Sequence, residues 1–197
     1  MPLGASGSPL DLGQLLLANA RSAMYVVYHA VKPRRLWLPD YLCPCVSHES
    51  YAVASYPVSE QLVPGADWVR DVQPGDLVVF IDYFGASFDA ELGWAVKERK
   101  GIVLEDAAQA LFTPRNPSAD YAIYSPTKFL GIPDGGILWS REKVSVALEE
   151  PPSDWLHVSY RARRDGSYED FCLAKKLCPT GYYAMSKYSK GNLRAEP

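Results

Sequence analysis

A series of short apolar runs, separated by turn-forming residues, is the feature that most limits how this chain can fold. Such runs predict buried strands. Between two of them, residues 88–100 place Phe88, Leu92, Ala95 and Val96 on one helical face, as in a helix packed on a sheet. The alternation predicts an α/β fold with a mostly parallel sheet and helices on both faces. The runs are LWLP at 36–39, VASYPV at 53–58, LVVFIDYF at 77–84, GIVLED at 101–106, DYAIYS at 120–125 and GGILW at 135–139.

The segment 19–31 predicts an apolar helix that Pro33 stops. In a parallel sheet, ligands bind beyond the carboxyl ends of the strands. Candidate site residues are therefore those that follow each run. They are Asp40 and Tyr41, Tyr83 and Gly85, residues 106–109, and residues 125–128.

Composition limits the function classes. The chain has 197 residues, of which 48% are hydrophobic, and this is enough for one domain with a buried core. A net charge of −3 gives no support to nucleic-acid binding by phosphate neutralisation. No stretch without Asp, Glu, Lys or Arg exceeds ten residues, so no membrane span is expected. The first residues lack the features of an export signal, which favours a cytoplasmic protein with reduced thiols.

The cysteines do not predict a metal site. Cys43 and Cys45 form a C-x-C pair, whereas Cys172 and Cys178 form C-x5-C, and neither is the C-x2-4-C spacing of zinc sites. His48 is near enough in sequence to be a third ligand, but buried cysteine more often acts as a small hydrophobic residue.

The chain changes character near residue 150. Pro151 and Pro152 mark a break, and the last forty-one residues carry eight basic and four acidic side chains. No periodic apolar stripe is evident in 157–197. We therefore divide the chain into an α/β domain over 1–150 and a basic C-terminal segment over 151–197.

Lys128 lies in YSPTKFLGIPDGG, between a predicted strand and a glycine pair, with Ser125 three residues before it. A lysine amine can form a Schiff base with an aldehyde cofactor. Asp106 ends the preceding predicted strand, where a carboxylate can hold a pyridine nitrogen protonated, although the same side chain can also cap a helix.

Five motifs in order resemble the DegT/DnrJ/EryC1/StrS family, over roughly residues 10–140. These are ARSAM at 20–24, LPDYLCP at 38–44, IDYFG at 81–85, EDAAQAL at 105–111 and SPTKFLGIPDGG at 125–136. Members are sugar-modifying aminotransferases of fold type I that depend on pyridoxal 5′-phosphate (PLP). The resemblance implies transfer of an amino group from an amino acid, such as L-glutamate, to a keto-sugar, in particular a nucleotide-linked one, in a cytoplasmic homodimer.

The resemblance also implies roles for the central residues. Lys128 would bind the cofactor covalently and then move the proton during transamination. Asp106 would pair with the ring nitrogen, and Gln109 would donate to the phenolic oxygen.

Further residues would hold the rest of the cofactor. Ala20, Arg21 and Ser22 open the first long helix and would bind the phosphate, with Ser22 alternatively only a helix cap. Ser125 would be a second phosphate ligand. Tyr41 is expected to stack on the ring, although a gapless match places Cys43 there and Tyr41 can equally be ordinary packing.

The sequence also departs from the family. Ile123 and Ser125 stand where many members have serine and histidine. Only about sixty residues follow Gly136, which predicts that the C-terminal small domain is largely missing and that the chain alone is not an efficient aminotransferase.

Two other interpretations of the sequence remain. One is an acyl-transferring serine enzyme in which Lys128 activates Ser125 through the S-x-x-K motif. Such enzymes also need S-D-N and K-T-G motifs, and this sequence contains neither. The other is a non-catalytic binding protein with a partner-facing basic tail.

Overall fold

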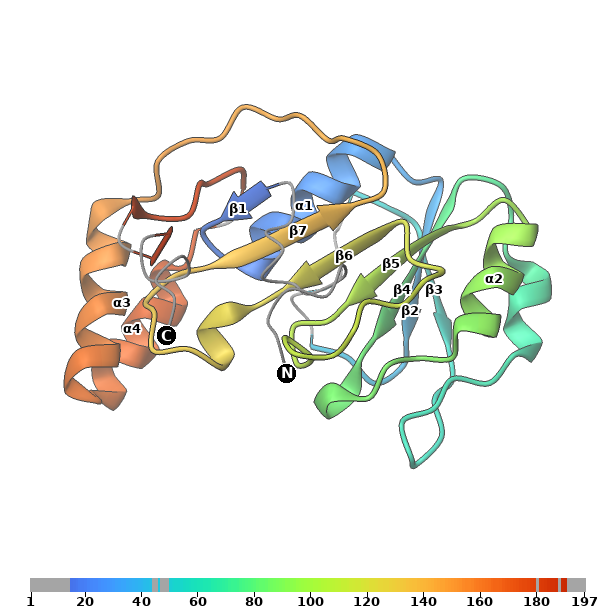
Figure 1. The fold of residues 1–197 in the computed structure, drawn as a ribbon, viewed down its shortest axis with the longest axis horizontal. Helices are drawn as coiled ribbons and strands as arrows, with labels where there is room; N and C mark the ends of the chain where they lie inside the picture. Colours follow the sequence, from blue (N-terminus) through green and yellow to red (C-terminus); the bar gives the residue numbers. More distant parts are fainter. Residues whose placement is uncertain (1–14, 44–45, 47–49, 180, 188, 191–197) are drawn as a thin grey trace.

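The computed structural model describes residues 15–43, 46, 50–179, 181–187 and 189–190. Seven strands form one sheet in the order β1-β7-β6-β5-β4-β2-β3 (Figure 1). From β3 to β6, each strand pairs parallel with its neighbour. β1 and β7 pair antiparallel at the other edge. The predicted α/β fold with a mostly parallel sheet is confirmed. The strands are β1 (Leu15–Leu17), β2 (Arg35–Pro39), β3 (Val53–Tyr56), β4 (Asp76–Ile81), β5 (Ile102–Asp106), β6 (Tyr121–Tyr124) and β7 (Gly136–Ser140).

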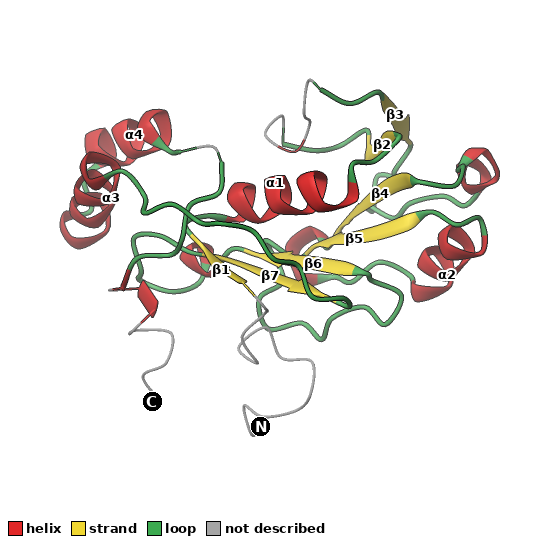
Figure 2. Cartoon of the chain, turned by 90° about the horizontal axis from the view of Figure 1, so that it is seen from above, coloured by secondary structure: helices red, strands yellow, loops and turns green. Residues whose placement is uncertain are grey.

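Helices cover both faces of the sheet, as Figure 2 shows. α1 (Ala20–Val31) and α2 (Ala90–Glu98) lie on opposite sides. Side chains alternate between the faces of a strand, so Leu77 and Val79 pack in the cluster that includes α1, whereas Val78 and Phe80 pack in the cluster that includes α2. The continuous apolar runs therefore follow from burial on both faces.

Short single-turn helices follow the carboxyl ends of two strands. The predicted strand 77–84 ends at Ile81, and η3 (Tyr83–Gly85) turns the chain away from the sheet. η4 (Pro126–Lys128) follows β6. A further turn, η2 (Asp67–Asp71), precedes β4. These turns end the ladder hydrogen bonds and leave side chains free to line a site.

The C-terminal segment contains two helices that the sequence pattern did not predict. α3 (Ser153–Asp165) and α4 (Tyr168–Leu177) form a hairpin at the end of the molecule away from α2 (Figure 1). Trp155, Val158 and Ser159 are the buried residues of α3. Within 157–197, α3 buries only Val158 and Ser159 and α4 buries no residue, so these helices carry little apolar patterning that the sequence could have revealed.

Residues after the hairpin return to the sheet. The backbone N–H of Ala18 donates to the carbonyl of Tyr183, and that of Met185 donates to the carbonyl of Leu16. The C-terminal segment therefore extends the β1 edge. Among the described helices, none combines the length and apolar character needed to span a bilayer. Cys45 and His48 lie outside the described residues, and within those residues no three metal-ligating side chains gather.

Candidate cofactor and substrate site

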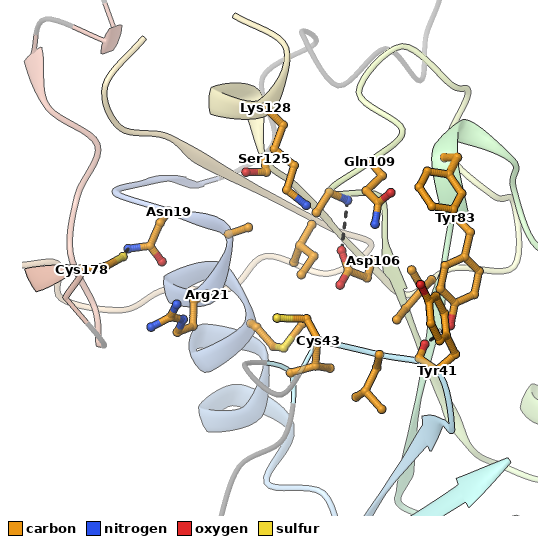
Figure 3. Close-up of a pocket in the computed structure, with 18 of the residues that line it drawn as sticks. Asn19, Arg21, Tyr41, Cys43, Tyr83, Asp106, Gln109, Ser125, Lys128 and Cys178 are labelled. Atoms are coloured by element: carbon orange, nitrogen blue, oxygen red, sulfur yellow. Dashed lines mark hydrogen bonds between the residues drawn. The ribbon is translucent and has the colours of Figure 1, made fainter. Parts of the chain in front are cut away.

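A cavity of about 600 Å³ lies beyond the carboxyl ends of β4, β5 and β6. Figure 3 shows Lys128, Ser125, Asp106 and Gln109 around the same space. The structure thus brings together residues far apart in sequence, as expected at this edge of a parallel sheet. Of the residues expected to hold the cofactor, all but Ser22 line the cavity: Ala20, Arg21, Tyr41, Asp106, Gln109, Ser125 and Lys128. Asp40, Gly85 and Thr127, which were candidates because they follow a strand, do not line it.

Asp106, the last residue of β5, is only 8% exposed. Its Oδ1 accepts a hydrogen bond from the backbone N–H of Ala108 at 3.0 Å, which stabilises the turn after the strand. Burial raises the pKa of Asp106, while this hydrogen bond and the charge of Lys128 oppose the rise. Asp106 therefore caps a turn and also presents a poorly solvated carboxyl group to the cavity, where a cationic ligand would favour its ionised form.

Lys128 is the last residue of η4, directly after β6. Its backbone N–H donates to the carbonyl of Ser125 at 3.1 Å, and the hydroxyl groups of Ser125 and Thr127 are 3.2 Å apart. The guanidinium of Arg163 on α3 donates to the carbonyl of Thr127 at 2.7 Å. The loop that carries Lys128 is therefore held both by its own turn and by the C-terminal hairpin.

The N-terminus of α1 forms another wall. Asn19 is its N-cap, because its Oδ1 accepts from the N–H of Ser22 at 2.8 Å. Ala20 and Arg21 line the cavity, but Ser22 does not: it is fully buried in the helix, and its Oγ has no partner among the described residues. The structure therefore does not bring the Ser22 hydroxyl to the site, and the alternative that Ser22 caps the helix is also wrong.

A close approach between β7 and α1 fixes this wall. A Cβ atom on Gly136 would lie 2.2 Å from the backbone carbonyl of Asn19, so only glycine permits the observed contact. The glycine pair that follows Lys128 in sequence thus sets the position of the first turn of α1 beside the lysine loop.

Aromatic residues form the wall opposite α1. The Tyr83 hydroxyl donates to the carbonyl of Tyr41, and the two rings lie 5.8 Å apart. Tyr41 is 57% exposed and Phe84 is 76% exposed. Both Tyr41 and Cys43 line the cavity, so each remains a candidate to contact a bound ring.

Three of the polar lining residues were missed by the sequence analysis. Lys175 and Cys178 come from the C-terminal segment, and Asn19 precedes the first motif residue. The side-chain amide of Asn19 donates to Cys178 Sγ at 3.6 Å and to the Pro179 carbonyl at 3.2 Å. Nothing in the sequence around Lys175 or Cys178 indicated that α4 returns to this edge of the sheet.

A second group of acids is buried beneath the site. Glu105 and Asp82 are fully buried, and each carboxyl group lies close enough to affect the pKa of the other. Burial and the neighbouring Asp82 charge raise the pKa of Glu105 to about 9, and burial raises that of Asp82 to about 6. The N–H of Asn116 donates to both oxygens of Glu105, at 3.0 and 3.2 Å. Neighbouring residues on β5 thus serve two environments, with Asp106 on the cavity side and Glu105 within the core.

The residues of the cavity fit PLP. Arg21 Nε is buried and has no hydrogen-bond partner among the described residues, as expected of a group that awaits an anion. Asp106 offers the buried carboxyl group that a pyridinium nitrogen needs, and Lys128 supplies the amine. The cavity is within the size range of cofactor sites.

Comparison with known proteins shows the class of fold. No family model matches the sequence, and no curated protein is a significant match. The fold matches solved structures of PLP-dependent enzymes of fold type I, including sugar aminotransferases. The chain spans about half the length of the structures it matches.

Particular structures show the extent of the likeness. The PLP form of Spr1654, a putative sugar aminotransferase from Streptococcus pneumoniae, has a TM-score of 0.56 and 14% identity, covering 96% of this chain and 58% of that chain. A NifS-like protein has a TM-score of 0.58 and 17% identity, covering 86% and 55%. NtdA from Bacillus subtilis, with bound PMP, has a TM-score of 0.56 and 13% identity, covering 66% and 33%. At these identities the likeness establishes the fold.

Proposed function

We propose that this chain binds PLP and acts as an aminotransferase. The observation that carries the proposal is the meeting of Lys128, Asp106 and Gln109 at one cavity in a fold shared with PLP-dependent enzymes. When bound, the cofactor supplies a conjugated ring that accepts the electron pair of a carbanion.

The chain's own residues divide the remaining work. Lys128 would hold the cofactor through its side-chain amine, and the same amine would take and return a proton at the substrate carbon. Asp106 would keep the ring nitrogen protonated, and Gln109 would donate to the phenolic oxygen. Ala20, Arg21 and Ser125 bind the phosphate, with Arg21 offering its unpartnered Nε.

We propose an amino acid such as L-glutamate as donor and a nucleotide-linked keto-sugar as acceptor, in a cytoplasmic homodimer. The putative sugar aminotransferase Spr1654 among the matched structures supports this acceptor class. The resemblance of the motifs around Lys128 and Asp106 supports the same choice.

The second candidate function is cofactor or partner binding without efficient turnover. The exposed Tyr41 and Phe84 favour it, because the cavity is open beside them in the described chain. Transamination needs the substrate held within near-attack distance, and misplacement by about 1 Å can cost on the order of a hundredfold in rate.

Borohydride reduction after incubation with PLP tests cofactor attachment. We expect the visible absorbance band to disappear and one reduced cofactor to be found on the Lys128 peptide by mass spectrometry. Lys128→Ala should abolish the adduct, whereas Lys143→Ala should retain it. An adduct on Lys97 or Lys143, or none, would contradict the proposal.

Single-turnover conversion of PLP to the pyridoxamine form with L-glutamate then separates the two functions. Saturable conversion supports the aminotransferase. A cofactor adduct without conversion supports the binding function.

A further inference from the structure

A second cavity, of about 470 Å³, lies between the α3–α4 hairpin and the start of α1. We call it the hairpin chamber. Thr127, the neighbour of Lys128, lines it, and Asn19, Arg21 and Lys175 line both it and the Lys128 cavity. The two cavities are therefore adjacent, and a ligand bound across both would have one end at the proposed cofactor site.

Cationic side chains that lack carboxylate partners gather in the hairpin chamber. Arg21, Arg163 and Lys175 line it, and in the described part of the chain no carboxylate forms a salt bridge with any of them. One N–H of Arg163 donates to the Thr127 carbonyl, and the Lys175 ammonium lies 4.7 Å from the centre of the Phe171 ring. These contacts position the charges without neutralising them.

Other arginines of the hairpin are paired. Arg161 contacts Asp170 at 2.8 Å, and Arg164 contacts Asp165 at 2.6 Å. Neither arginine lines the hairpin chamber. The unneutralised positive charge is thus concentrated on the chamber wall, and the opposite side of the hairpin carries the ion pairs.

The carboxylate in the chamber wall, Asp134, is already bound. Its oxygens accept from the N–H and hydroxyl of Ser186 at 2.7 and 2.6 Å and from the hydroxyl of Ser189. Asp134 is 1% exposed and anchors the segment after the hairpin. With Arg21 assigned to the cofactor phosphate, Arg163 and Lys175 still face this one carboxylate, so the chamber carries a net positive charge.

We propose that the hairpin chamber binds a phosphate group of the substrate, with Arg163 and Lys175 as ligands and Arg21 between the two cavities. This inference rests on the proposed function, because it assigns the reacting end of the same substrate to Lys128. Phosphate carries up to two charges and matches the arginine fork, which suits this group of cations better than a single carboxylate. Trp155 and Phe171 give the chamber an apolar wall for the carbon skeleton.

The α3–α4 hairpin supplies the proposed phosphate ligands and also contacts the loop that carries Lys128. Arg163 touches the Thr127 carbonyl next to Lys128, and Lys175 borders both cavities. A phosphate in the chamber would hold a substrate at the end remote from the reacting carbon, which limits its motion at Lys128.

Isothermal titration calorimetry with inorganic pyrophosphate, on the full chain already saturated with PLP so that the proposed cofactor phosphate site is filled, tests the subsite without turnover. Lys175→Ala should weaken binding about tenfold, the effect of losing about 1.4 kcal/mol of charge-assisted contact. Lys176→Ala is the matched control, because it removes the same charge from the next residue of α4, which does not line the chamber. Succinate should bind more weakly than pyrophosphate.

The outcomes separate this inference from the proposed function. The borohydride-fixed adduct on Lys128 tests the proposed function alone, and its absence from the unmutated chain would contradict cofactor attachment whatever the pyrophosphate result. Absence of pyrophosphate binding, equal weakening by Lys175→Ala and Lys176→Ala, or succinate binding as tightly as pyrophosphate would each overturn the phosphate subsite.

Discussion

The buried Glu105 gives this protein a pH-dependent stability that one substitution should remove. Glu105 is fully buried beside Asp82, and its pKa is raised to about 9 by burial and by the Asp82 charge. An unfolded glutamate titrates near its ordinary value of 4.5. Between these two values the folded chain holds one more proton than the unfolded chain, so stability decreases as pH rises.

The size of the effect follows from that one proton. Each pH unit inside the window costs about 1.36 kcal/mol, so Glu105 alone should remove roughly 2.7 kcal/mol of unfolding free energy between pH 6 and pH 8. For a chain of this size, this corresponds to roughly 5–11 °C in Tm. Glu105→Gln keeps the size of the side chain and an oxygen acceptor for the Asn116 N–H, but it cannot titrate.

Denaturant unfolding of both proteins from pH 6 to pH 8 measures the prediction. The variant should lose about 2.7 kcal/mol less than the unmutated chain across this range. Glu98→Gln, at the exposed end of α2, is the matched control and should follow the unmutated chain. Parallel pH profiles for the unmutated chain and Glu105→Gln would refute the assignment of a buried proton to Glu105.

Three further substitutions probe the site and its supports. Asp106→Asn should stabilise the cofactor-free chain near neutral pH, because burial raises the pKa of this carboxyl group. The same substitution should slow single-turnover conversion on the order of a hundredfold. Unchanged conversion would show that Asp106 only caps a turn. Gly136→Ala should prevent stable folding or lower Tm sharply because its Cβ would meet Asn19 at 2.2 Å, whereas Gly131→Ala has open space and should fold normally; equal Tm values would contradict the close approach. Trp155→Ala should cost about 3–5 kcal/mol or selectively open the hairpin, since this ring is 4% exposed, and hydrogen exchange in α3 and α4 that matches the unmutated chain would argue against its role.

Local sequence pattern determined the sheet and much of the candidate site. Apolar runs marked six of the strands because burial on both faces requires continuous hydrophobic side chains. Residues that follow strands, including Asp106, Ser125 and Lys128, reached one cavity because parallel strands end at the same edge. The three-residue β1 was too short for such a pattern, and its pairing is with distant β7.

Tertiary contacts decided what remained. Ser22 belongs to a motif, but the helix turns its side chain into the core while Asn19 provides the cap. Lys175 and Cys178 reach the cavity only because α3 and α4 fold back, a contact between segments more than a hundred residues apart that sequence spacing does not encode. Likewise, Glu105 and Asp106 are adjacent carboxylates in sequence, and only the packing around each face of β5 sends one to the core and the other to the cavity.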